Sequence, residues 1–310
     1  MMKTKLIYDQ FACEIYDLDC HTITANEVST LLDLLFKYKV LIIKKQTIAV
    51  EQYKTFIEKM GKPIHHVLQN FALDGLPEII KISNYIDETG EQFGVLDGGA
   101  YWHSDMSYTP DLGIATSLYS IQVPADGGET HFINLVDGLD KLYTNKALLH
   151  KIEEQCSAEL DAIYVRHLFG NRRKLTDATS SEQHLSEVQT QMLQEVRHKL
   201  VEQHPVTQEK TLFAISGTSF FIDQLSEQQS VKLLDALEDY VFSHAQQYHH
   251  RYEQGDIVIW DNTTTLHSGH QIQPTSDFSQ CRLLYRMNIS YHSAQTSEPC
   301  DSLQETAYYV

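Results

Sequence analysis

The sequence predicts a mainly β fold with flanking helices, and three observations support this prediction. Short runs rich in β-branched and aromatic residues, bounded by Gly, Pro or Asp, recur through much of the chain. Clear helical periodicity is limited to a few segments between these runs. No repeat or low-complexity linker divides the 310 residues, and single β-rich domains of this length are common. We therefore expect one domain, residues 1–310, in which strands from both ends of the chain fold together around a helical insert at about residues 137–208.

The N-terminal segment is expected to combine two helices with a buried strand. After a short opening strand, residues 24–39 carry apolar side chains at helical spacing, with Thr24 or Asn26 as the N-cap. Residues 40–45, VLIIKK, are typical of a buried strand. Residues 49–61 predict a second helix, which ends at its final glycine.

The rest of the chain is expected to be rich in strands on either side of the insert. Before the insert, strands are predicted at residues 77–84, around His103, at 115–123 and at 128–135. After it, strands are predicted at residues 210–215, 219–222, 256–262 and 281–291, and a helix at 225–245 has Ser226 as its cap. The tail, residues 293–310, is expected to be peripheral.

Composition and charge favour a protein that acts on small molecules. The formal net charge of -18 argues against a surface for nucleic acid or for an anionic membrane, because both require clustered Lys and Arg. The chain start has no apolar leader segment, and no run approaches the roughly 18 apolar residues of a membrane span. The five cysteines are scattered and are expected to be reduced thiols. We expect a cytoplasmic protein with a small-molecule substrate, and a homo-oligomer is left open.

One short stretch, GGAYWHSDMSY at residues 98–108, carries candidate metal ligands. If this stretch is a strand, His103 and Asp105 face the same side, because side chains alternate along a strand. The two groups could point to solvent, form a buried hydrogen-bonded pair, or hold a metal together. By itself an H-x-D pair favours the first two readings. The third requires a distant ligand, since a site with two histidines, one carboxylate and open positions is what a non-haem Fe(II) oxygenase needs.

A second stretch, GDIVIWDNTTTLHSGH at residues 255–270, offers that ligand. It is an apolar strand that ends in Trp-Asp-Asn and is followed by His267. Arg282 follows fifteen residues later, in RLLYR. With these two stretches together, the metal-binding interpretation becomes the favoured one.

The combination resembles the taurine/2-oxoglutarate dioxygenase (TauD/TfdA) family. The matching features are WHSD, DGGET with its threonine 27 residues after His103, WDN seven residues before the distal histidine, and RLLYR, over about residues 62–290. GKPIHH and LSEQQSVKLLDAL are further landmarks. The resemblance implies a double-stranded β-helix, or jelly roll, with flanking helices.

The resemblance also implies the roles of individual residues. It makes His103, Asp105 and His267 the iron ligands, and Thr130 and Arg282 the pair that holds the distal carboxylate of 2-oxoglutarate. The chemistry agrees, because two neutral imidazoles and one carboxylate suit Fe(II) and leave positions for the 2-oxo acid and O₂. The Arg282 guanidinium matches a carboxylate, and the threonine hydroxyl can donate to the same group.

Four further residues are candidates for the substrate side. In a strand, Arg286 faces the same side as Arg282 and could bind a substrate anion, or it could form a structural ion pair. His66 matches a pocket position of the taurine-specific members, or it is an ordinary loop histidine. Tyr101 and Met106 flank the iron motif and could shape the pocket, although core packing is the commoner role.

The insert carries a basic run, YVRHLFGNRRK, with Arg166, His167, Arg172 and Arg173. In this fold an insert can close over the substrate as a lid, but such a run is more often a solvated face.

The resulting prediction is an Fe(II)- and 2-oxoglutarate-dependent oxygenase that oxidises a C–H bond of a small, anionic substrate and releases succinate and CO₂. The same cofactors could instead support desaturation, cyclisation or isonitrile formation. A hydrolase or isomerase with the same ligands, or a non-catalytic jelly roll with a vestigial metal site, are the alternatives from other classes. Neither of these has a use for the Thr130 and Arg282 pair.

Overall fold

The computed structural model describes residues 2–8, 10–96, 99–170 and 194–291. Two sheets form the centre of the described chain, and their strands come from both ends of the sequence. The large sheet has the order β1-β2-β3-β15-β7-β17-β6-β5, with β4 paired to β17, and the small sheet has the order β14-β8-β16. The strands of the large sheet are β1 Lys3–Tyr8, β2 Ala12–Tyr16, β3 Val40–Ile43, β4 Lys62–Ile64, β5 Ala72–Leu73, β6 Leu76–Ser83, β7 Ile114–Gln122, β15 Ile257–Asp261 and β17 Leu283–Ser290. Those of the small sheet are β8 Thr130–Asn134, β14 Gln247–His250 and β16 Thr265–Gly269.

A buried apolar cluster fills the space between the two sheets. Ile42, Leu118 and Val258 come from the large sheet, and Phe132 comes from β8 of the small sheet. The Phe132 and Trp260 rings meet edge to face with centroids 5.3 Å apart. The predicted jelly roll is therefore the observed architecture.

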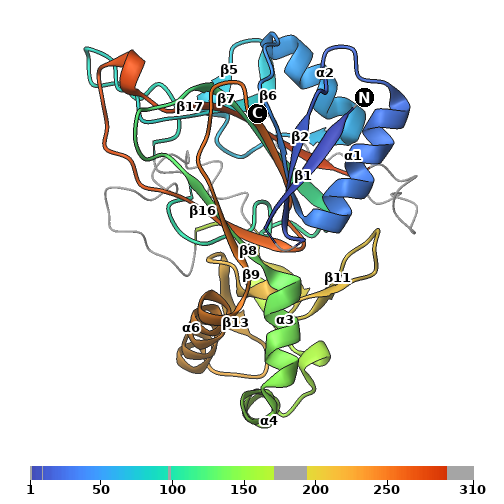
Figure 1. Cartoon of the computed structure of the whole chain (residues 1–310). Coiled ribbons are helices and arrows are strands. Elements are labelled where there is room, and N and C mark those ends of the chain that lie inside the picture. Colours follow the sequence, from blue (N-terminus) through green and yellow to red (C-terminus); the bar gives the residue numbers. More distant parts are fainter. Residues whose placement is uncertain (1, 9, 97–98, 171–193, 292–310) are drawn as a thin grey trace.

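Two helices cover the outer face of the large sheet, beside β1 and β2 in Figure 1. They are α1 Ala25–Tyr38 and α2 Val50–Met60. Thr24, not Asn26, is the N-cap of α1, and it forms a capping box with Glu27. Gly61 ends α2 as predicted. The apolar faces of both helices join one core cluster with β3, β15 and β17.

The insert differs from the prediction because it is only partly helical. It begins with α3 Leu135–Thr144 and α4 Lys146–Cys156, and continues with strands β9 Tyr164–His167 and β10 Val196–Lys199. These strands pair with β13 Ser219–Ile222 in the order β10-β9-β13, which we call the insert sheet. The helix α6 Glu227–His244, capped by Ser226, lies beside α3 at the same end of the molecule (Figure 1).

Two predicted strands are wrong. The stretch around His103 is an isolated bridge to His267, followed by consecutive turns at residues 105–108, because Met106 has a left-handed φ of 60°. Residues 210–215 form only the short strand β12 Lys210–Thr211, paired with β11 Glu202–Gln203, and then a 3₁₀ turn. The predicted tail at residues 293–310, Cys300, Arg172 and Arg173 lie outside the described residues. Among the described helices, none combines the length and the apolar character that a bilayer crossing requires.

Candidate active site

The structure brings His103, Asp105 and His267 together at one edge of the small sheet. His267 lies on β16, and His103 forms a two-way backbone bridge with it through N–H···O contacts of 2.9 and 2.8 Å. Asp105 follows in the turn, so that its Oδ1 lies 3.4 Å from His103 Nε2 and its Oδ2 lies 3.6 Å from His267 Nε2. One ligand atom from each of the three residues lies within 4.8 Å of the others.

The donor atoms of these three side chains fit a divalent metal such as Fe(II). His103 Nδ1 donates to the Tyr101 carbonyl oxygen at 2.8 Å, which leaves the lone pair on Nε2 toward the carboxylate. Burial lowers the pKa of His267 well below its usual value, so this imidazole is neutral. Burial alone would raise the pKa of Asp105, but the charge of Arg286 leads the opposing effects, and the pKa is well below its usual range. Two neutral imidazoles and one carboxylate are the donors of a facial triad.

A ring of contacts that the sequence did not reveal fixes the Asp105 carboxylate. The Thr116 hydroxyl donates to Asp105 Oδ2 at 2.7 Å and accepts from Asn262 Nδ2 at 2.8 Å and from Asn288 Nδ2 at 2.7 Å. Asn288 Oδ1 in turn accepts from Arg286 Nε at 3.1 Å. Because two amides already donate to the hydroxyl, its one proton is directed to the carboxylate. Of Thr116, Asn262 and Asn288, only Asn262 lies in a stretch that the sequence analysis singled out, the WDN triplet.

Thr116→Val is expected to weaken metal binding about 10- to 100-fold, the usual range for loss of a contact that orients a metal ligand. The valine has a similar shape but cannot donate to Asp105. A titration with Mn(II), with free Mn(II) followed by electron paramagnetic resonance, measures the effect. Thr264→Val is the matched control, because that buried hydroxyl has no hydrogen-bond partner within the described residues. Equal affinities in the two variants would contradict the role of Thr116.

Arg286 is paired with the carboxylate and still retains hydrogen-bonding capacity. Its Nη2 lies 2.9 Å from Asp105 Oδ1, a close ion pair whose angles are not those of a hydrogen bond. The predicted alternative of an ion pair is thus present in the structure. A guanidinium has five N–H donors, and in the described chain only Nε and Nη2 engage protein side chains. Nη1 remains able to donate to an incoming group.

Thr130 and Arg282 lie close to a tyrosine that was not predicted. The Thr130 hydroxyl lies 2.9 Å from the hydroxyl of buried Tyr252. Burial raises the pKa of Tyr252, while Thr130 and the positive charge of Arg282 act against that rise. Arg282 is itself buried, and its Nη1 donates to the His270 carbonyl oxygen at 3.4 Å. These residues form a cationic, hydroxyl-lined region beside the small sheet.

Of the other three candidates, His66 lies within electrostatic reach of Arg286 and Asp105. It is buried, its Nδ1 accepts from the Leu68 N–H at 3.1 Å, and burial, with Arg286 next, lowers its pKa to about 3. The Tyr101 ring lies 4.9 Å from the His103 ring. Met106 is buried, and its sulfur accepts from the Tyr108 hydroxyl.

Gly99 is a further residue that the sequence analysis did not single out. Its φ of 88° lies in the left-handed region, and a Cβ built on it would lie 2.3 Å from His103 Cε1. Its carbonyl accepts from Gly269 N at 2.8 Å, which ties this segment to the end of β16. Only glycine therefore allows the backbone to pass this close to the imidazole.

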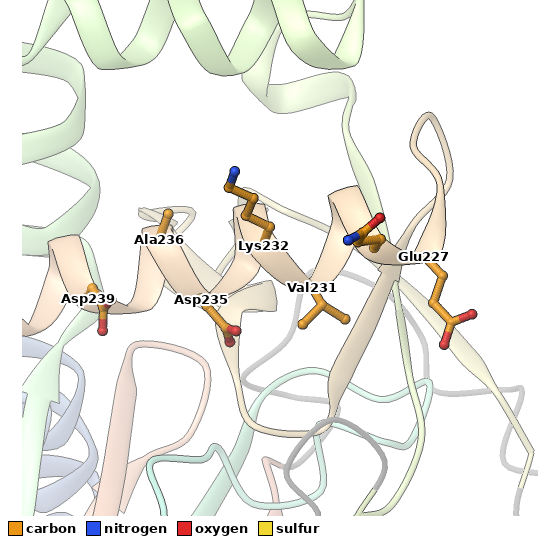
Figure 2. A pocket seen from close by; sticks show the side chains of 7 residues that line it. Glu227, Val231, Lys232, Asp235, Ala236 and Asp239 are labelled. Carbon is orange, nitrogen blue, oxygen red and sulfur yellow. The ribbon is translucent and has the colours of Figure 1, made fainter.

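A surface hollow of about 680 Å³ lies elsewhere, along the outer side of α6 (Figure 2). The side chains that line it lie between Glu227 and Asp239, and none of the predicted site residues is among them. The hollow is open, and all the side chains that line it come from α6. We therefore place the candidate site at the three converging donors and not at this hollow.

Comparisons with known proteins find similar sequences. The family model described as taurine catabolism dioxygenase TauD, TfdA family, matches residues 7–288. The chain is 25% identical over 264 residues to the (S)-phenoxypropionate/alpha-ketoglutarate-dioxygenase of Sphingobium herbicidovorans, covering 82% of this chain and 83% of that protein. It is also 25% identical over 256 residues to the alpha-ketoglutarate-dependent sulfate ester dioxygenase of Pseudomonas putida, covering 81% and 76%.

Solved structures share the fold. The crystal structure of AAD-2 in complex with Mn(II) and N-oxalylglycine superposes with a TM-score of 0.70 at 22% identity, covering 96% of this chain and 99% of that one. A taurine dioxygenase from Burkholderia xenovorans gives a TM-score of 0.68 at 22% identity, covering 94% and 90%.

Proposed function

Because the chain belongs to the TauD/TfdA family of Fe(II)- and 2-oxoglutarate-dependent dioxygenases, we propose that it oxidises a C–H bond of a small, anionic substrate. The observation that carries the proposal is the convergence of His103, Asp105 and His267 next to a cationic, hydroxyl-lined region. With iron bound there, 2-oxoglutarate and O₂ supply the oxidation, in which 2-oxoglutarate loses CO₂ and becomes succinate. The remaining tasks fall to the protein's own side chains.

The first task is to hold 2-oxoglutarate, and we assign it to Arg282, Thr130 and Tyr252. The distal carboxylate needs a buried positive charge, which Arg282 provides as a planar fork of donors. The Thr130 and Tyr252 hydroxyls, 2.9 Å apart, can each turn a proton toward the same carboxylate. Gly128 makes room for the arginine, because a Cβ there would lie 3.2 Å from Arg282 Cδ.

The second task is to hold the substrate, and we assign it to Arg286 and His66. The remaining donors of Arg286 suit a carboxylate, sulfonate or sulfate group. His66 is neutral and accepts at Nδ1, so its Nε2 carries a proton that can be donated. The names of relatives that act on phenoxypropionate and sulfate esters agree with an anionic substrate.

A screen of succinate release tests the substrate class. Each anionic candidate is paired with its neutral amide or alcohol, and we expect the anionic member to be the better substrate. Arg286→Lys and Arg286→Gln are then compared at saturating Fe(II), so that loss of the Asp105 ion pair does not limit the reaction. The glutamine variant should raise the apparent KM for the anionic substrate at least tenfold, while the lysine variant, which keeps the charge, should raise it less. Best activity with neutral substrates would contradict the proposal.

Product analysis on the best substrate separates hydroxylation from desaturation or cyclisation. One relative, the pentalenolactone F synthase of Streptomyces arenae, is 25% identical over 246 residues.

A vestigial, non-catalytic site is tested more simply. Anaerobic addition of Fe(II) and 2-oxoglutarate should give the weak visible charge-transfer band of the chelate, and its absence would favour the binding-protein alternative.

A further inference from the structure

The segment that carries Asp105 has no regular secondary structure to hold it in place. Residues 104–109, which we call the ligand turn, follow the His103 bridge and contain the consecutive turns at residues 105–108. Met106 has a φ of 60°, a conformation that non-glycine residues adopt only when their surroundings enforce it. Contacts from outside must therefore determine the position of the Asp105 carboxylate.

On one side of the ligand turn these contacts come from the insert sheet and from the residues that directly precede its strand β13. The Ser104 N–H donates to Ser216 Oγ at 3.2 Å, and Ser107 Oγ lies 2.7 Å from Thr218 Oγ1. Thr218 Oγ1 also lies 3.0 Å from Nδ1 of His167. All five side chains are buried, and the hydroxyls have no bulk water with which to replace a lost partner.

Each strand of the insert sheet contributes to this contact. His167 comes from β9, Thr218 directly precedes β13, and His198 on β10 contacts the Thr109 carbonyl oxygen through Nε2 at 2.8 Å. His167 and His198 lie on one face of the sheet, with ring centroids 5.2 Å apart. On the opposite face Arg166 pairs with Asp223 and is partly exposed, as expected for a solvated basic residue.

We propose that the insert sheet positions Asp105, and that Thr218 is the residue through which the sheet fixes the ligand turn. This inference rests on the proposed iron site. The sequence analysis considered the insert as a lid, whereas the described strands of the insert support the metal side of the site. Since binding energies are reciprocal, metal bound at Asp105 must in turn stabilise the insert sheet.

Thr218→Val tests the proposal, because it keeps the shape of the side chain and removes the hydroxyl. We expect Mn(II) affinity of the full-length metal-free protein to fall on the order of tenfold. Thr218→Ser should restore most of it. Thr211→Val is the matched control: this threonine on β12 is also buried, but its hydroxyl has no hydrogen-bond partner within the described residues. His103→Ala, in the same titration, identifies the binding that belongs to the candidate site.

Hydrogen exchange of the wild-type protein gives a second readout that needs no variant. Mn(II) should slow amide exchange in residues 164–167 and 196–199. Equal Mn(II) affinity of Thr218→Val and wild type, or unchanged exchange in these two strands, would overturn the positioning role while leaving the proposed function intact. If the wild type shows no Mn(II) binding that depends on His103, the proposed function and this inference both fail.

Discussion

Replacing His103 or His267 with alanine is expected to abolish iron-dependent turnover of 2-oxoglutarate while the protein stays folded. Each change removes one of three donors, and the two that remain cannot hold the metal in a defined geometry. Succinate release with added Fe(II) measures the loss, and circular dichroism checks the fold. His249→Ala is a suitable control, because that histidine is exposed on β14 and stacks on His131, away from the three donors. Substantial turnover in either variant would rule out the assigned ligand set.

Asp105→Ala is expected to abolish turnover as well, but with an additional cost in stability. It leaves the Arg286 guanidinium, whose side chain is only 13% exposed, without the buried carboxylate, and breaking a largely buried ion pair in this way costs about 3–5 kcal/mol. Asp105→Asn is a milder change that helps to separate the loss of turnover from the loss of stability, because the amide oxygen still accepts a hydrogen bond. Asp105→Glu should also fail, because the added methylene displaces the ligand oxygen and disturbs the Thr116 contact. Thermal unfolding of these variants, compared with His103→Ala, tests the difference.

Arg282→Ala is expected to raise the 2-oxoglutarate requirement about 30-fold or more and to leave Fe(II) affinity nearly unchanged. Loss of one partner from a desolvated charge pair costs about 2–5 kcal/mol, which gives this range. The metal should be spared, because Arg282 is not one of the three donors and is tied to Asn84 and to the His270 carbonyl oxygen. Arg251→Ala, an exposed arginine at the molecular surface, serves as the control.

The reverse pattern would be informative. If Arg286→Ala damages 2-oxoglutarate binding and Arg282→Ala is harmless, the roles of the two arginines have been exchanged. The dependence of the rate on 2-oxoglutarate concentration, measured at saturating Fe(II), separates these cases.

The convergence of the three donors could be predicted from sequence because His103, Asp105 and His267 lie in recognisable stretches. His103 and Asp105 share WHSD, and His267 follows the apolar strand that ends in WDN. The local structure that joins them was not predictable in the same way. The alternating pattern around His103 is typical of a strand, but the left-handed Met106 and the buried hydroxyls of Ser104 and Ser107 convert it to a turn.

The residues that surround the ligands were missed because their role depends on strand order. Thr116 lies opposite Trp260 on one neighbouring strand and opposite Asn288 on the other. Only this arrangement, with β7 between β15 and β17, brings the two asparagine amides to one hydroxyl. A buried threonine in an apolar strand carries no such information in its own sequence. The helices of the insert were predicted, but its strands were not, for a related reason. These strands are short, and β9 pairs with β13, which lies far along the chain.

The bridge between His103 and His267 has a consequence for how the protein folds. The small sheet that supports it joins β8 to β14 and β16, strands that lie on either side of the insert in the sequence. Contacts of such large sequence separation form late and slowly, because the intervening chain must be ordered first. During synthesis, the segment with His103 and Asp105 is therefore exposed long before its third ligand emerges. A nascent chain that lacks β16 cannot bring the three donors together, so we expect metal loading to follow synthesis of that strand.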